Sequence, residues 1–185
     1  GTDYTNEAKD GNVYYPPEEF SLKDRVLDAR DRIRERKSVG YNIIYAFNCR
    51  NISLSNLVLH EASTWTVKLE RCNGVTVTDL VIDNNIHVAN SDGIDIVSSK
   101  NVNISHCFIA TGDDGIVIKS PSDNVENVFV DDCSIMSLAN NFKIGTETGF
   151  DVKNVEVGNC YFFTAECAGG YSGIAIESAD GADLS

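Results

Sequence analysis

Residues 75–82, Val-Thr-Val-Thr-Asp-Leu-Val-Ile, contain the pattern that decides the fold. Two short runs of alternating apolar residues are joined by one polar residue, Asp79. The pattern begins again at Ile52, Val102, Val128 and Val155, at intervals of roughly 26 residues, which is a period typical of repeat architectures. Alternation is the signature of strands, and the change of phase at the polar residue indicates a corner.

A third alternating run lies between these copies. Its apolar pairs are Val67 and Leu69, Ile94 and Ile96, Ile116 and Ile118, Phe142 and Ile144, and Ile174 and Ile176. Three short strands in each repeat form one turn of a parallel β-helix, in which every rung covers the rung below it. A sandwich of hairpins is disfavoured, because two-residue turns of the Asn-Gly type are largely absent.

The pattern divides the chain into two parts. Residues 39–185 are expected to form an all-β, right-handed parallel β-helix of about five to six rungs. Residues 1–38 lack the repeat and are expected to be irregular or partly helical. Because residues 178–185 stop where another rung would begin, the domain is expected to be truncated at its C-terminal end.

The cysteines follow the repeat. Cys107, Cys133 and Cys160 share one repeat position and should stack inward, while Cys49 and Cys72 share another. Buried free thiols are the simpler reading, with disulfides as the alternative. No Cys-x-x-Cys pair occurs, which argues against a zinc site.

Composition restricts the partners. A net charge of −13 offers no basic face for nucleic acid. No apolar run approaches 18 residues, so no membrane-spanning helix is expected. We expect the protein to be a monomer.

Three carboxylates coincide in the repeat. Asp92 and Asp114 both lie two residues before the first apolar residue of the third run, with Asp113 beside Asp114. In register they occupy adjacent rungs, about 5 Å apart. Crowded carboxylates repel, so at least one should retain its proton to higher pH. That supplies the acid and the base that glycoside hydrolysis needs.

Turn formation and calcium binding are the alternative roles for these carboxylates. Asp-Gly pairs often only shape turns, and clustered carboxylates also bind calcium. Asp95, Lys119, Lys143 and Glu177 should point outward on the same face, either lining a groove or remaining ordinary surface charges. Trp65 occupies the position equivalent to Asp92 and is a candidate platform for a sugar ring.

The two Asp motifs resemble a known family. Asn90-Ser-Asp-Gly-Ile-Asp95, followed by Thr111-Gly-Asp-Asp-Gly-Ile-Val-Ile-Lys-Ser120, is similar to glycoside hydrolase family 28, the polygalacturonase family. The resemblance implies metal-independent hydrolysis of pectic polysaccharide with inversion. It implies that Asp113 is the general acid and that Asp92 and Asp114 activate water.

Two stretches depart from that family. Where it usually has Gly-His-Gly, this chain has Ala139-Asn140-Asn141, and where it usually has Arg-Ile-Lys, this chain has Ala175-Ile176-Glu177. Lys143 is the candidate to replace part of the lost positive charge. Asn90, which belongs to the first matching motif, and Asn140, which stands where the family has histidine, are expected to bind substrate together with Asp95, Lys119, Lys143 and Glu177.

The sequence therefore predicts a glycosidase that cleaves a pectin-like polysaccharide, with no cofactor and no metal. A polysaccharide lyase on the same fold and a non-catalytic carbohydrate-binding β-helix are the alternatives. The resemblance implies an extracellular or periplasmic location.

Overall fold

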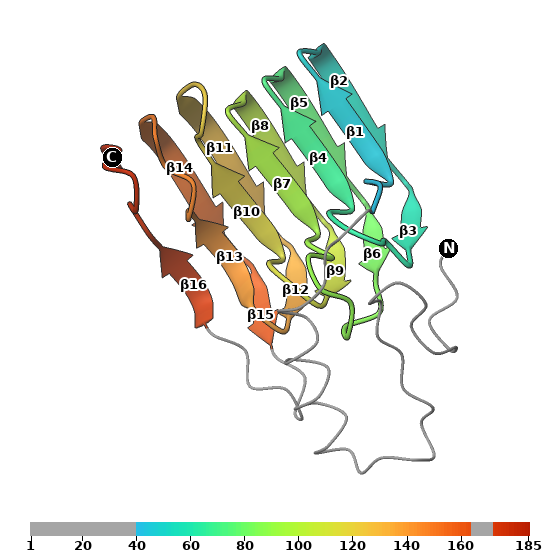
Figure 1. Cartoon of the computed structure of the whole chain (residues 1–185). Helices are drawn as coiled ribbons and strands as arrows, with labels where there is room; N and C mark the ends of the chain where they lie inside the picture. Colours follow the sequence, from blue (N-terminus) through green and yellow to red (C-terminus); the bar gives the residue numbers. More distant parts are fainter. Residues whose placement is uncertain (1–39, 164–171) are drawn as a thin grey trace, which may run out of the picture.

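The alternating apolar runs form strands that wind around one core (Figure 1). The computed structural model describes residues 40–163 and 172–185. The expectation for residues 1–38 falls outside the described residues, and so does Cys167. In the part that is described, no helix is long and apolar enough to cross a membrane.

Each turn of the chain contributes one strand to each of three parallel sheets. Sheet A has the order β1-β4-β7-β10-β13-β16, sheet B the order β14-β11-β8-β5-β2, and sheet C the order β15-β12-β9-β6-β3. The strands of sheet A are β1 (Ile44–Phe47), β4 (Val67–Glu70), β7 (Ile94–Val97), β10 (Ile116–Lys119), β13 (Asn140–Ile144) and β16 (Ser172–Ile176). Those of sheet B are β2 (Arg50–Ser55), β5 (Asn73–Thr78), β8 (Lys100–Ser105), β11 (Val125–Asp131) and β14 (Val152–Gly158). Those of sheet C are β3 (Val58–His60), β6 (Val81–Asp83), β9 (Phe108–Thr111), β12 (Ser134–Ser137) and β15 (Tyr161–Phe163).

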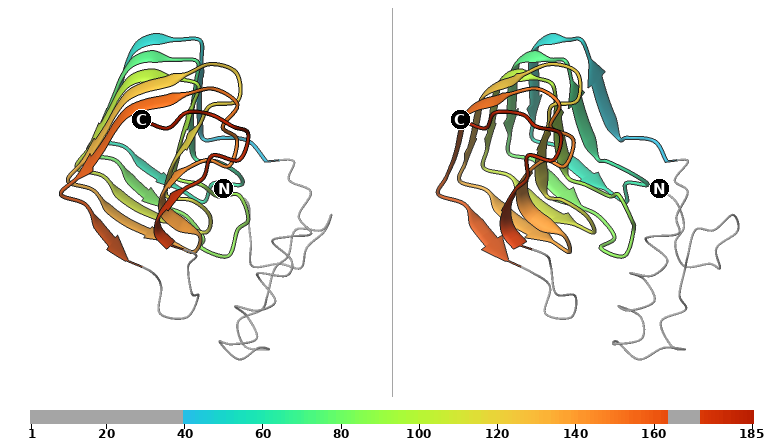
Figure 2. Two further views of the ribbon diagram at one scale, coloured as in Figure 1. Left: turned by 90° about the vertical axis from the view of Figure 1, so that its left-hand side faces the viewer. Right: turned by 60° about the vertical axis from the view of Figure 1, so that its left-hand side comes forward.

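This arrangement is a right-handed parallel β-helix, the hand that parallel crossovers adopt. Seen along the stack, the strands of successive turns lie one behind another (Figure 2). Six strands in sheet A and five in each other sheet confirm the predicted number of rungs. The strand β1 was not predicted, because Ile43–Phe47 is apolar on both faces and shows no alternation.

Inward side chains of the three sheets form the core. Ile94, Ile116 and Phe142 stack on neighbouring strands of sheet A and are buried. Full burial of such a side chain contributes about 1.5–3 kcal/mol. Cys107 and Cys133 are buried and Cys160 is half-buried, all as free thiols, which confirms the predicted inward position.

Polar residues with left-handed backbone angles form the corners. The residues between the sheet B and sheet C strands all have φ between 50° and 55°, as predicted from their side chains: Asn56, Asp79, His106, Asp132 and Asn159.

A ladder of asparagine amides fixes the corner between sheets A and B. The side chain of Asn101 donates to that of Asn73 at 2.9 Å, Asn127 donates to Asn101 at 2.8 Å, and Asn154 donates to Asn127 at 2.7 Å. We call these four residues the asparagine ladder. Because Asn101 and Asn127 each donate to one neighbour and accept from the other, the ladder holds the rungs in register.

Candidate active site

Three carboxylates meet where the chain enters sheet A. Ile94 pairs with Ile116 across β7 and β10, so Asp92 lies beside Asp114, as the repeat predicted. One oxygen from each of Asp92, Asp113 and Asp114 lies within 4.8 Å of the others. The register of two strands therefore creates the cluster.

The glycines after these aspartates allow the close approach of the rungs. A Cβ atom on Gly93 would overlap the carbonyl oxygen of Gly115, and one on Gly115 would overlap that of Asn141. Instead, the Gly93 N–H donates to the carbonyl of Asp114 at 2.9 Å. A side chain at either position would push the carboxylates apart.

Asp113 is the most accessible of the three acids. It is half-buried, whereas Asp92 and Asp114 are only 3% and 5% exposed. Its carboxylate accepts the backbone N–H of Asn90 at 3.2 Å and that of Asp114 at 3.0 Å. Burial, reinforced by the charge of Asp114, raises the pKa of Asp113 despite these hydrogen bonds.

Asp92 has an unpaired oxygen. Its Oδ1 is buried and accepts no hydrogen bond from a described residue, while its Oδ2 lies 4.0 Å from the ammonium of Lys119. Burial, followed by the charges of Asp95 and Asp113, raises the pKa of Asp92 well above its ordinary value. The free oxygen can accept a proton or a hydrogen bond from a small molecule.

Asp114 is held by polar partners on the next rung. Its Oδ1 accepts two hydrogen bonds from Asn140, one from the side chain at 2.7 Å and one from the backbone at 3.2 Å. Its Oδ2 lies 3.4 Å from the ammonium of Lys143, which also lies 3.8 Å from Glu177. The side-chain Oδ1 of Asn140 accepts a hydrogen bond from the hydroxyl of Ser172 at 2.7 Å. Asn140 thus orients Asp114 through hydrogen bonds that bridge three rungs.

Asp95 is buried beside the cluster. It is on the outer side of sheet A, as predicted, but it has no exposed surface and cannot contact a substrate directly. The ammonium of Lys119 lies 3.3 Å from the Oδ1 atom of Asp95 and forms an ion pair with it. The angles at this contact do not fit a hydrogen bond. Burial, opposed by the charge of Lys119, raises the pKa of Asp95 to about 7.

Lys119 joins several groups of the site. Burial lowers its pKa, but the charges of Asp95, Asp92 and Glu147 outweigh that effect, and the pKa of Lys119 is raised. Its ammonium lies 3.8 Å from the ring centre of Trp65, a cation–π contact. The contact of Glu147 with Lys119, at 4.0 Å, was missed because Glu147 lies in the loop after β13, outside the repeat.

Trp65 lies beside the cluster, in register with Asp92, as the repeat predicted. Its ring is half-buried, and the Lys68 ammonium lies 5.2 Å from its centre. One ring is therefore held between the carboxylates and the earlier rungs of sheet A.

The three carboxylates have a spacing that a hard divalent cation accepts, since calcium takes oxygen ligands from several aspartates. Two ammonium groups, of Lys119 and Lys143, already stand next to these acids at 4.0 and 3.4 Å. The charge of the cluster is therefore partly balanced by the chain itself.

The sequence is similar to known proteins. The profile of the glycosyl hydrolases family 28 matches residues 28–182. A probable polygalacturonase of Arabidopsis thaliana is 37% identical over 120 residues, which cover 62% of this chain and 25% of that protein. An endo-polygalacturonase of Pectobacterium parmentieri is 28% identical over 168 residues, covering 91% of this chain and 40% of that protein.

A solved structure has the same fold. The crystal structure of a hyperthermoactive exopolygalacturonase from Thermotoga maritima aligns with a TM-score of 0.58 at 21% identity, covering 85% of this chain and 42% of that chain. This likeness supports the parallel β-helix. The chain spans between a quarter and about two fifths of the length of these relatives.

Proposed function

Because this chain belongs to the glycosyl hydrolases family 28, we propose that its carboxylate cluster is the cleavage centre of a glycosidase acting on a pectin-like polysaccharide. The observation that carries the proposal is the set of three carboxylates whose oxygens lie within 4.8 Å of one another, in unequal surroundings. Unequal environments separate the pKa values of identical groups, which allows one to act as acid and another as base.

Asp113 is the general acid in this proposal. It is the most accessible of the three, and its raised pKa favours the protonated form that an acid needs. It donates that proton to the glycosidic oxygen as the bond from this oxygen to the sugar carbon breaks. The leaving sugar departs as an alcohol, and Asp113 becomes a carboxylate.

Asp92 and Asp114 activate the attacking water. The unpaired Oδ1 of Asp92 can accept one water proton, while Asn140 and Lys143 fix the orientation of Asp114. As the water oxygen bonds to the sugar carbon, only that one proton passes to a carboxylate of the pair, and the other proton stays on the oxygen as the hydroxyl group of the new reducing end. A water molecule suits this place because both acids are almost fully buried.

The surrounding residues position these groups or contact the sugar. The backbone N–H of Asn90 holds Asp113, and Asp95 holds Lys119. Lys119, Lys143 and Glu177 are proposed to contact the sugar hydroxyls next to the cleaved bond. The proposal includes a polysaccharide outside the cell as substrate and a monomeric protein.

Release of reducing sugar tests this function. The chain would be incubated with polygalacturonate, methyl-esterified pectin and neutral galactan, as itself and with the substitution Asp113→Asn. Loss of general acid catalysis should lower kcat by roughly 100-fold or more with little change in KM. Asp83→Asn, at an exposed aspartate ending β6, is the matched control. Equal rates for Asp113→Asn and the unchanged chain would refute the assignment.

A further inference from the structure

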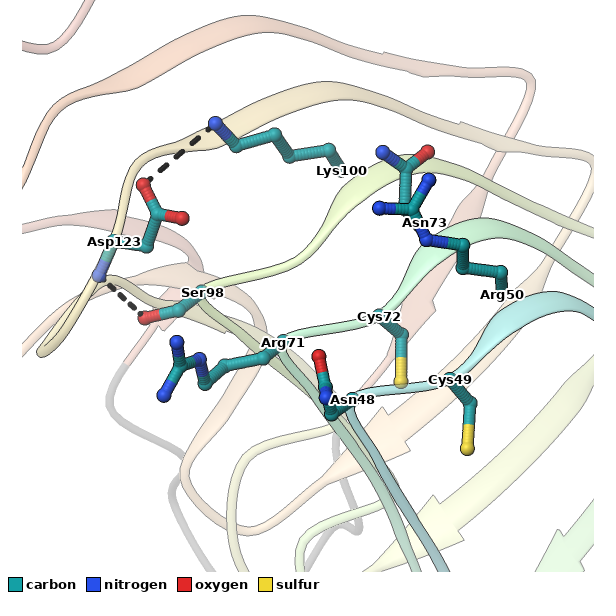
Figure 3. Close-up of a pocket in the computed structure, with 9 residues that line it drawn as sticks. All are labelled: Asn48, Cys49, Arg50, Arg71, Cys72, Asn73, Ser98, Lys100 and Asp123. Atoms are coloured by element: carbon teal, nitrogen blue, oxygen red, sulfur yellow. Dashed lines mark hydrogen bonds and ion pairs between the residues drawn. The ribbon is translucent and has the colours of Figure 1, made fainter.

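A hollow of about 230 Å³ lies at a corner of the β-helix, away from the carboxylates (Figure 3). Its walls come from the ends of β1, β4 and β7 and the starts of β2, β5 and β8. Arg50 pairs with Asn73, and Asn73 with Lys100, so these three occupy equivalent positions on three rungs. The hollow is therefore built by the repeat itself.

Positive charge is concentrated in this hollow. The described part of the chain has only seven lysines and arginines, and three of them, Arg50, Arg71 and Lys100, line it. The one carboxylate in the lining is that of Asp123, which lies 3.6 Å from the Lys100 ammonium. In a protein with a net charge of −13, this local excess of cations is unusual.

Two of the cations form no ion pair within 4.0 Å with a carboxylate of the described ranges, although the charge of Arg71 acts on Glu70 from a greater distance. Each of the five described lysines lies within 4.0 Å of a carboxylate. Among the described residues, no such pair involves the exposed guanidinium groups of Arg50 and Arg71. Figure 3 shows Arg50 directed back over the hollow near Asn73, and Arg71 directed toward the side of Ser98 and Asp123. Guanidinium groups that form no close ion pair favour a planar anion, since each can donate two parallel hydrogen bonds to a carboxylate.

Amide groups complete the lining. The Oδ1 atom of Asn73 accepts a hydrogen bond from the Asn101 side chain within the asparagine ladder. The Nδ2 protons of Asn73 take no part in that hydrogen bond. The exposed amide of Asn48 lies at the other side of the hollow. Amides with spare donors and acceptors suit the hydroxyl groups of a sugar.

The carboxylate cluster lacks cations of this kind. Lys119 is paired with Asp95, and Lys143 with Asp114, while Ala175 and Glu177 occupy the later rung. An acidic sugar at the cluster would meet lysines that are already neutralised. The cations that form no close ion pair, Arg50 and Arg71, lie instead at the hollow.

The outer face of sheet A connects the two places. Asp92 precedes β7 and Ser98 follows it, so they lie about 20 Å apart along an extended strand. Near the hollow, Tyr45 and Phe47 on β1 are 53% and 49% exposed, and their ring centres are 6.2 Å apart. Trp65 lies nearer the cluster. Aromatic rings along the way offer flat apolar surfaces to sugar rings.

We propose that this hollow, through Arg50 and Arg71, binds a carboxylate of an acidic oligosaccharide whose cleaved bond lies at the carboxylate cluster. The inference rests on the proposed function and adds a second place of binding, so that the acidic chain must be long enough to span the hollow and the cluster. It also explains how the chain selects an acidic sugar without an arginine at the cluster.

Binding to the Asp113→Asn chain tests the inference without turnover. Calorimetry would measure the dissociation constants of an oligogalacturonate that spans about 20 Å, of a galacturonate dimer, and of the carboxyl-reduced, neutral form of the long chain. These would be compared with the same background carrying Arg50→Gln and Arg71→Gln together. Arg50→Lys with Arg71→Lys keeps the charge and removes the planar fork, and Lys153→Gln, at an exposed cation on β14, is the control.

The expected result is a loss of about tenfold or more in affinity for the long acidic chain in the glutamine variant, because charged hydrogen bonds are lost. The lysine variant should recover part of this affinity. Lys153→Gln should change the affinity for the long acidic chain little. The glutamine variant should bind the dimer and the neutral chain about as well as the Asp113→Asn chain does. Equal affinities for the long acidic chain, or no binding of it by the parent, would overturn the inference. Reducing-sugar release by the unchanged chain decides the proposed function separately, so the two can fail independently.

Discussion

The carboxylate of Asp95, which has no exposed surface, lies 3.3 Å from the ammonium of Lys119. The same ammonium lies 4.0 Å from Asp92 and 3.8 Å from the ring centre of Trp65. One buried ion pair therefore fixes a cation between a proposed catalytic acid and an aromatic ring. Asp95 acts on the site through Lys119 and not by contact with solvent.

Asp95→Asn should stabilise the protein as the pH rises. The folded-state pKa of Asp95 is raised to about 7, so the folded state binds its proton more tightly than the unfolded state does. The associated stability is complete below about pH 4 and is lost as the pH rises to about 7. Asparagine cannot ionise, so the advantage of the variant should grow across this range to at most about 4 kcal/mol. Urea unfolding between these pH values measures it, with Asp83→Asn as control. An advantage that does not vary with pH would contradict the prediction.

Asp114→Asn should shift the alkaline limb of the pH–rate profile toward lower pH. Burial is the main cause of the raised pKa of Asp113, and the charge of Asp114 is the next. Removing that charge lowers the pKa of Asp113, so the general acid loses its proton earlier as the pH rises. The profile of kcat for the residual activity measures the shift. A limb that stays in place would show that a group other than Asp113 sets it.

Chelation should leave activity unchanged, because Lys119 and Lys143 supply the positive charge beside the cluster. Activity would be measured with EDTA and then with added calcium, while ultraviolet absorbance monitors unsaturated sugars. Reducing ends should form without unsaturated product. Calcium-dependent formation of unsaturated ends would identify a lyase instead.

Cleavage should invert the configuration of the sugar carbon. Asp92 and Asp114, at 3% and 5% exposed, are too enclosed to bond to a sugar carbon but can orient a water molecule. Their oxygens lie within 4.8 Å of Asp113, closer than the roughly 6.5–9.5 Å usual between the carboxyl groups of inverting enzymes. The stereochemical outcome therefore distinguishes an attacking water from an attacking aspartate. Proton NMR during early hydrolysis identifies the first anomer, and retention would indicate a covalent intermediate on one aspartate.

The repeat in the sequence predicted much of this architecture. Strand register follows from apolar alternation, and the pairing of Ile94 with Ile116 brings Asp92 to Asp114 without further assumption. The first strand of sheet A was missed because a terminal rung can be apolar on both faces. Its residues Tyr45 and Phe47 remain exposed there.

The depth of each site residue was not predictable from the sequence. Alternation places Asp95 on the outer side of sheet A, but it does not reveal that the Lys119 ammonium lies against Asp95 or that Asp95 has no exposed surface. The hydrogen bonds of Asn140 to Asp114 and Ser172 join three rungs. Glu147 lies in a loop, where no periodicity constrains its place.

The asparagine ladder separates the length of a turn from its alignment. Consecutive members lie 28, 26 and 27 residues apart in the chain, yet their amides meet at similar distances. A turn that is one or two residues longer or shorter therefore still brings the next asparagine to the same place, and later rungs keep their alignment. Loops between the strands can therefore differ in length from one turn to the next without disturbing the stacking of the strands.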